Sequence, residues 1–360
     1  MYDILSYMKL IATVKLNPTE EQANALLATL ERANDACNYI SERAWEKQTF
    51  NRYKIQQLCY YEVKEQFKLS AQLAIRCIAK VADAYLLDKK IQRVFKQYGS
   101  IAYDDRILKY YTDRSRVSIW TLGGREHIPF FCGESQRTLL QTRHGESDLI
   151  YRNGNFYLFA TADIEEPPPE EVNKYLGIDL GVVNIAVDSD GEIHTAEAID
   201  KVRVCYANLK DSLQRYGSKN AKRKLKKLSG REKRFRKDRN HCISKQLVEK
   251  AKDTKRGIAL ENLNGIRQRT TVKKSQRARH HTWSFSQLRQ FVEYKAKRFG
   301  VLIVLVNPRN TSKTCAHCGH LDKRNRKSQS HFECTSCGHV AIADVNAAEN
   351  ISALAAVNQP

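Results

Sequence analysis

The sequence predicts an α+β domain followed by an α/β domain that carries a small inserted metal-binding module. Three observations support this order. An acidic, proline-rich stretch at Glu165–Glu171 divides the chain and is typical of a stiff linker. After it, apolar strands end on the acids Asp179 and Glu261, with helical segments between them. Four paired cysteines then lie between positions 315 and 337, ahead of a further helix.

The composition indicates a folded protein with a polyanionic partner. The chain has 360 residues, of which 42% are hydrophobic, so it can bury the cores of two or three domains. Its formal net charge of +21 favours nucleic acid as that partner. No apolar run is long enough to span a bilayer, and Met1–Lys15 lacks the pattern of a signal peptide. We therefore expect no membrane partner and a cytoplasmic, nucleoid-associated protein, with the oligomeric state left open.

The part of the chain before the linker has a helical pattern followed by a strand-rich one. Lys9–Lys15 predicts a strand, and Asn17-Pro18-Thr19 predicts the start of a helix. Apolar residues then recur at helical spacing to about Gly99. From there to Ile164, glycines separate short strands, and Asn153-Gly154-Asn155 predicts a hairpin turn.

After the linker, strands alternate with helices, which is typical of an α/β domain. Tyr175–Gly191 predicts a strand, a glycine turn, a second strand and a hairpin turn. Lys219–Arg239 is strongly basic with one thin apolar stripe and predicts long helices. The further elements are expected in this order: a strand at Lys255–Glu261, a helix at Trp283–Arg298, a strand at Val301–Val306 and a helix at Asp344–Ala356.

Two CxxC pairs separated by fifteen residues have the spacing of a zinc ribbon. They are Cys315, Cys318, Cys334 and Cys337. Gly319 and Gly338 permit the tight turn after each pair, and four sulfurs close a tetrahedral shell, so one Zn²⁺ here is structural. Neighbouring histidines offer replacement ligands, whereas a redox dithiol is disfavoured because no thioredoxin-like unit surrounds the pairs. The six other cysteines are expected to be small buried side chains.

Three acids far apart in the sequence each lie at the end of a predicted element. Asp179 and Glu261 end apolar strands, and Asp344 begins a helix rich in small residues. Taken singly, an Asp before a glycine turn is often a turn former, and an Asp at a helix start is often an N-cap. Together, in a basic chain, the three predict one site at a sheet edge that holds two catalytic Mg²⁺ ions through hard oxygen ligands.

Four stretches resemble the TnpB proteins of bacterial insertion sequences. They are Gly177-Ile-Asp179-Leu-Gly-Val-Val-Asn184, Ala259-Leu-Glu261-Asn262-Leu263, Thr311-Ser312-x-x-Cys315-x-x-Cys318-Gly319 and Ala343-Asp344-Val345-Asn346-Ala347-Ala348-x-Asn350-Ile351. The miniature type V CRISPR effectors share this arrangement. The resemblance covers about Tyr175–Ala353 in order, spacing and residue type, and the first half only in outline.

The resemblance implies an RNase H-like RuvC nuclease domain with an inserted zinc ribbon, preceded by a β-barrel wedge domain with an inserted helical recognition lobe. The implied boundaries are 1–17 and 100–165 for the wedge barrel, 18–99 for the recognition lobe, 166–172 for the linker, 173–310 and 341–360 for the nuclease, and 311–340 for the ribbon. Asp179, Glu261 and Asp344 would then be the catalytic acids. Many members carry Asp-Arg before the last acid, where this chain has Ile342-Ala343, but the triad itself is complete.

The activity that the resemblance implies is RNA-guided, Mg²⁺-dependent cleavage of DNA. A guide RNA from the element's end would pair with target double-stranded DNA, and the protein would read a short motif beside the target. With a single site, a double-strand break needs two sequential cuts or two protomers, and the resemblance favours sequential cuts. The products would carry 5′ phosphates. The alternatives are a miniature type V CRISPR effector, an RNA-guided repressor without cleavage and a strand-joining transposase. The complete triad argues against the repressor, and the ribbon before the last acid argues against the transposase.

Two basic stretches are expected to hold nucleic-acid phosphates, the alternative being solvated helix faces. The candidate contact residues are Lys222, Arg223, Lys224, Lys226, Lys227, Arg231, Arg234, Arg267, Arg269, Lys273, Lys274 and Arg277.

Overall fold

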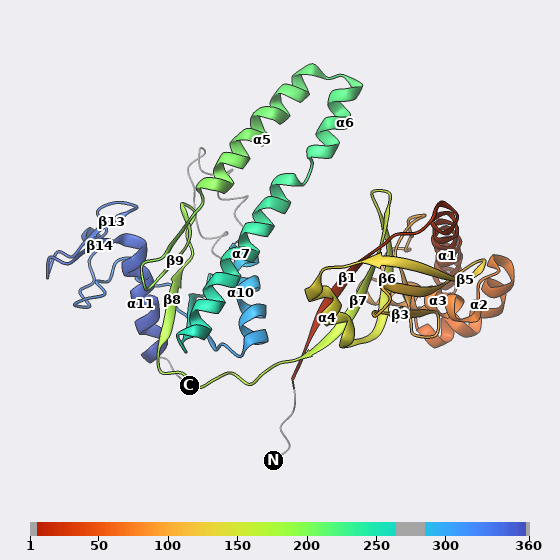
Figure 1. The fold of residues 1–360 in the computed structure, drawn as a ribbon, viewed down its shortest axis with the longest axis horizontal. Helices are drawn as coiled ribbons and strands as arrows, with labels where there is room; N and C mark the ends of the chain where they lie inside the picture. Colours follow the sequence, from red (N-terminus) through yellow and green to blue (C-terminus); the bar gives the residue numbers. More distant parts are fainter. Residues whose placement is uncertain (1–5, 264–284, 358–360) are drawn as a thin grey trace, which may run out of the picture. The chain divides into compact units, whose positions relative to one another are not determined.

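The structure is a computed structural model that describes residues 6–263 and 285–357. The chain divides into two compact units, an amino-terminal unit at Met1–Glu165 and a carboxy-terminal unit at Glu166–Pro360. Figure 1 shows the strands and helices of each unit. None of the helices in the described ranges combines the length and the apolar character needed to cross a membrane.

The amino-terminal unit is a curved antiparallel sheet with three helices inserted after its first strand. Its elements are β1 Tyr7–Leu16, α1 Glu20–Glu46, α2 Arg52–Phe67, α3 Ala71–Leu87, β2 Ile101–Tyr103, β3 Leu108–Tyr111, β4 Arg116–Thr121, β5 Gly124–Phe131, α4 Glu134–Gln141, β6 Arg143–Arg152 and β7 Asn155–Glu165. The seven strands have the order β2-β6-β7-β1-β5-β4-β3. Only residues 104–107 join the two edge strands, β2 and β3, so the sheet is a nearly closed barrel.

Local signals in the sequence explain two boundaries of this unit. Thr19 and Gln22 form a capping box that starts α1, as the sequence predicts. Asn153 and Gly154 have φ values of 52° and 78°, so the β6–β7 hairpin has the turn that this pair favours. One core joins the barrel to α1, α2 and α3.

Two expectations for this unit are wrong in detail. The helical pattern continues to about Gly99, but α3 ends at Leu87. The Asp88 carboxylate accepts a hydrogen bond from the Lys90 amide, and the Asp88 carbonyl oxygen accepts one from the Arg93 guanidinium. These bonds form a turn in place of further helical hydrogen bonds. The strand-rich region also contains α4, a helix of only two turns whose short periodicity gives little signal.

The carboxy-terminal unit is a mixed five-stranded sheet between helices. Its elements are β8 Tyr175–Asp179, β9 Asn184–Asp188, β10 Ile193–Thr195, α5 Glu197–Tyr216, α6 Lys219–Leu228, α7 Arg231–Asp253, β11 Gly257–Glu261, α10 Phe285–Phe299, β12 Ile303–Val306, the 3₁₀ helix η1 Lys323–Asn325, β13 His331–Glu333, β14 Val340–Ile342 and α11 Ala343–Val357. The strand order is β10-β9-β8-β11-β12, in which β8, β11 and β12 are parallel and β9 is antiparallel to its neighbours.

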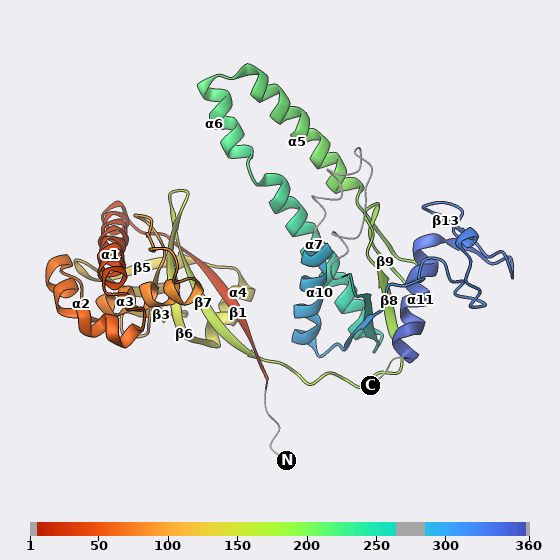
Figure 2. The same cartoon turned by 180° about the vertical axis from the view of Figure 1, so that it is seen from behind.

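Helices cover both faces of this sheet. Leu176, Ile178 and Leu260 pack with α7 and α10 on one face. Tyr175 and Ala259 pack with α11 on the other. Figures 1 and 2 show α11 and the pair α7 and α10 on opposite sides of β8. The strands β13 and β14 form a separate two-stranded sheet within the segment between β12 and α11.

The helices α5, α6 and α7 form an arm that projects from the sheet (Figure 2). Lys210 of α5 and Glu232 of α7 form an ion pair of 3.7 Å across it. Along the arm only a thin stripe of side chains is buried. For this reason Cys205 and Cys242 are exposed, which corrects the expectation that they are buried.

The contact between β8 and α11 is unusually close at Gly177. A Cβ atom added there would lie 2.0 Å from the Ala348 carbonyl oxygen and 2.6 Å from the Ser352 amide nitrogen. Only glycine allows the two backbones this separation. Because β8 ends at Asp179 and α11 begins beside Asp344, the contact fixes how far apart these acids lie.

Gly177→Ala is therefore expected to destabilise the carboxy-terminal unit by about 3 kcal/mol, since α11 must move away from β8 to admit a methyl group. Thermal unfolding followed by circular dichroism measures the loss. Gly133→Ala is the control, because a Cβ at Gly133 would meet nothing within 4 Å. We expect it to cost less than about 1 kcal/mol. An unchanged melting temperature for Gly177→Ala would contradict the close packing.

Candidate active site

The acids that end β8 and β11 lie side by side at the carboxyl edge of the sheet. The two strands are adjacent and parallel, so Asp179 and Glu261 are at corresponding ends. Tyr175 and Ala259, which pack against α11, precede these acids by an even number of residues. Because alternate side chains of a strand share a face, both carboxylates lie on the α11 side of the sheet.

Asp344 reaches the same edge from the first turn of α11, where it is 5% exposed. Its Oδ2 accepts a hydrogen bond of 2.9 Å from Asn184 Nδ2, at the start of β9. Its Oδ1 accepts one of 3.0 Å from Arg326 Nη2. The turn that brings Asn184 here needs Gly181, because a Cβ at that position would lie 2.6 Å from the Asn184 carbonyl oxygen. Asp344 is thus a buried carboxylate with a partner on each oxygen.

Negative charge is concentrated at this edge. The pKa of Asp179 is raised to about 7, mainly by burial and then by the charges of Glu261 and Asp344, and Arg326 partly offsets the shift. Burial also raises the pKa of Glu261, whereas its hydrogen bond from Thr311 lowers it. Clustered carboxylates of this kind favour a bound cation that neutralises them.

The four paired cysteines converge on one point. Within the described residues they are the one group of three or more potential metal ligands whose atoms all lie within 4.8 Å of one another. The Cys315 and Cys337 sulfurs are 3.8 Å apart, and the Cys318 and Cys334 sulfurs are 3.6 Å apart. Sulfurs about 2.3 Å from a tetrahedral Zn²⁺ are about 3.8 Å from one another, so the cluster fits one zinc ion.

The turns around this cluster are as the sequence predicts. Gly319 and Gly338 have φ values of 75° and 73°, and their amides donate to the carbonyl oxygens of Cys315 and Cys334. The three carboxylates, in contrast, are spread too widely to form one such group.

Three further residues contact the acids, although none of them was predicted as a site residue: Asn184, Thr311 and Arg326. Arg326 lies in a spacer rich in basic residues, where nothing in the sequence separates it from Arg324, which pairs with Asp322. Asn184 and Thr311 lie in stretches that resemble TnpB proteins, and that is their one signal. Their contacts with the acids come from the tertiary structure.

The predicted contact residues of the first basic stretch are all exposed, on α6 and the start of α7. They are Lys222, Arg223, Lys224, Lys226, Lys227, Arg231 and Arg234. The α6 helix contains no acidic residue. The residues of the second stretch lie outside the described residues. They are Arg267, Arg269, Lys273, Lys274 and Arg277.

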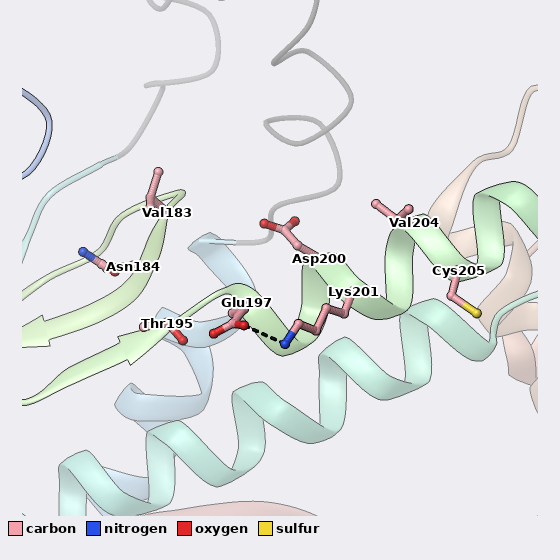
Figure 3. Close-up of a pocket in the computed structure, with 8 residues that line it drawn as sticks. All are labelled: Val183, Asn184, Thr195, Glu197, Asp200, Lys201, Val204 and Cys205. Atoms are coloured by element: carbon pink, nitrogen blue, oxygen red, sulfur yellow. Dashed lines mark ion pairs between the residues drawn. The ribbon is translucent and has the colours of Figure 1, made fainter.

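A cavity of about 680 Å³ opens beside Asn184, between β9 and α5 (Figure 3). Val183 and Val204 contribute apolar surface to it. Glu197 and Lys201 in its wall form an ion pair of 2.6 Å, drawn as a dashed line in Figure 3. Asn184, which lines this cavity, also bonds Asp344.

The raised pKa of Asp179 predicts a pH-dependent cost to stability. The pKa of its carboxyl is about 7 in the folded protein, against the ordinary value of 3.8. The carboxyl therefore favours folding below pH 4, and this contribution to stability is lost as the pH rises through 7. In buffer without added divalent cation, Asp179→Asn should raise the free energy of unfolding by up to about 4 kcal/mol at pH 8, and by less at pH 5. Urea unfolding of both proteins at the two pH values measures this. A gain that does not grow with pH would contradict the charge clustering.

Two family models match the chain: "Probable transposase" (OrfB_IS605) over residues 158–265 and "Cas12f1-like, TNB domain" over residues 285–351. The TnpB-like protein MJ0751 of Methanocaldococcus jannaschii is 35% identical over 195 residues, which are 51% of this chain and 69% of that protein. The CRISPR-associated endodeoxyribonuclease Cas12f1 of Syntrophomonas palmitatica is 35% identical over 202 residues, which are 51% of this chain and 38% of the relative.

The fold also has a solved counterpart. The cryo-EM structure of a Cas12f1-sgRNA-target DNA complex matches with a TM-score of 0.59 at 18% identity, over 93% of this chain and 83% of that chain. The family expected from the sequence motifs is confirmed by these matches, and the chain belongs to the TnpB-like proteins.

Proposed function

We propose that the protein is an RNA-guided DNA endonuclease of the TnpB type, with a single RuvC-like active site. The observation that carries the proposal is the meeting of Asp179, Glu261 and Asp344 at one sheet edge in a TnpB-like chain. The barrel would serve as the wedge domain, at 1–17 and 100–165, and α1–α3 as the recognition lobe within 18–99. Residues 166–172 would be the linker, 173–310 and 341–360 the nuclease, and 311–340 the ribbon.

The donor set at this edge suits two Mg²⁺ ions, since it consists of hard carboxylate oxygens that carry excess negative charge. Bound there, the ions would activate a water and stabilise the leaving 3′ oxygen. Asp179, Glu261 and Asp344 would hold them. Arg326, whose guanidinium contacts Asp344, would add positive charge beside the scissile phosphate. The ribbon's four cysteines would hold one structural Zn²⁺.

The arm is the candidate surface for nucleic-acid phosphates. Residues 219–239 contain twelve Lys and Arg and two acids, a net charge of +10 out of +21 for the chain. Such a surface binds phosphates without reading bases. The similar Cas12f1 structure is a complex with sgRNA and target DNA, which supports a guide RNA and double-stranded DNA as partners here.

A cleavage assay tests the proposal. The purified protein, with RNA transcribed from the DNA that flanks its gene and with Mg²⁺, should linearise a plasmid that carries the matched target and leave 5′ phosphates. A guide of scrambled sequence is the control. Binding of the target without cleavage would indicate a repressor, and joined strands would indicate a transposase. A repeat array beside the gene would instead favour a CRISPR effector.

A further inference from the structure

We propose that Thr311 is a positioning residue for Glu261, held in place by two asparagines of α11. This inference rests on the proposed nuclease function and adds to it a residue that sets the geometry of one carboxylate. Thr311 lies where the chain leaves β12 and enters the ribbon, and it is 4% exposed.

The hydroxyl of Thr311 is aimed at the acid. Its Oγ1 donates to Glu261 Oε1 at 2.5 Å and lies 3.2 Å from the Pro308 carbonyl oxygen. A hydroxyl has one proton, and the shorter contact to a charged acceptor takes it. Glu261 Oε1 is thereby fixed.

The backbone around Thr311 is irregular and takes its hydrogen-bond partners from α11. Asn350 Nδ2 donates to the carbonyl oxygens of Thr311, at 2.9 Å, and Thr314, at 2.8 Å. Asn346 Nδ2 donates to Thr314 at 2.8 Å, and its Oδ1 accepts the Ala316 amide at 2.9 Å. Both asparagines are buried, and the bonds offset the cost of burying their carboxamides.

Asn346 and Asn350 are four residues apart, so they lie on one face of α11. That helix also carries Asp344. One rigid element therefore sets Asp344 directly and Glu261 through Thr311. The arrangement holds two carboxylates from distant parts of the chain at a fixed distance from each other. A site for two ions requires such a fixed distance.

Two substitutions separate this role from simple packing. Thr311→Val keeps the shape and removes the hydroxyl, whereas Thr311→Ser keeps the hydroxyl. Mn²⁺ affinity, measured by electron paramagnetic resonance without nucleic acid, should fall about tenfold or more in Thr311→Val. Thr311→Ser should stay within about threefold of the unchanged protein. Cleavage rates at fixed Mn²⁺ should follow the same order. Thr254→Val is the matched control, because its hydroxyl bonds the Lys250 and Ala251 carbonyl oxygens and the Arg256 side chain, and none of the three acids.

The outcomes distinguish the positioning role of Thr311 from the nuclease function. If Thr311→Val binds Mn²⁺ and cuts like the unchanged protein, or if Val and Ser lose affinity equally, the positioning role is wrong and the nuclease proposal stands. If the unchanged protein neither binds Mn²⁺ at this site nor cuts DNA, the proposed function fails and this inference fails with it. Melting temperatures of all variants show whether an affinity loss reflects unfolding.

Discussion

Replacing Asp344 by asparagine is expected to reduce DNA cleavage by at least about a thousandfold while guide-directed binding of the target persists. The carboxylate is 5% exposed, and Asn184 and Arg326 each occupy one of its oxygens. An amide has nearly the same shape, so the fold should survive. It carries no negative charge, however, and its NH₂ group would face the donors of Asn184 or Arg326. The substitution would therefore weaken the binding of the metal ions and leave the fold intact.

The measurement pairs two assays on the same preparation, plasmid cleavage and gel-shift binding with a matched guide RNA. Glu333→Gln is the control, since it removes one acid from the exposed surface of the ribbon. Cleavage by Asp344→Asn at a rate near that of the control would remove Asp344 from the site. Loss of binding together with cleavage would indicate misfolding instead.

Loss of the ribbon's metal is expected to have a comparably large effect. Apart from Cys315 and Cys334, the ribbon's apolar core is small: it consists of Phe332, which packs with Ala343 at the start of α11. Its strands β13 and β14 have three residues each. A structural zinc ion contributes on the order of 10 kcal/mol to such a module. Cys334→Ser should therefore unfold the ribbon and withdraw Arg326 from Asp344.

We expect Cys334→Ser to lose its one zinc and to cut at least about a hundredfold more slowly. Elemental analysis gives the zinc content and the plasmid assay gives the rate. Cys242→Ser is the matched control, because this exposed thiol lies on α7, outside the four-cysteine cluster. It should keep both zinc and activity. Full activity in a zinc-free protein would separate the ribbon from catalysis.

Much of the fold follows from patterns that are local in the sequence. The strand that ends at Asp179, the Asn153-Gly154 turn and the two CxxC pairs each depend on a few neighbouring residues, and each is found where expected. The end of α3 at Leu87 could not be predicted, because the side chains of Asp88 and Arg93 compete with a pattern that otherwise continues.

The site itself was predictable only in part. The acids end regular elements, and that position marks them. Thr311 and Arg326 lie in irregular segments, and their contacts with Glu261 and Asp344 depend on how α11 and the ribbon pack. No local spacing encodes such contacts. The sequence also did not predict that Cys242 is exposed, because the burial of a residue on the arm depends on which elements pack against its helix.

The hydrogen bond between Asn184 and Asp344 joins residues 160 positions apart in the chain. Ribosomes add roughly 5–20 residues per second, so on the order of ten to thirty seconds pass between the synthesis of these two partners. During that time β8 and β9 exist without α11, and the emerging chain has only part of its site. A polypeptide that is still being translated would therefore lack the complete set of three acids until α11 leaves the ribosome and docks on Gly177.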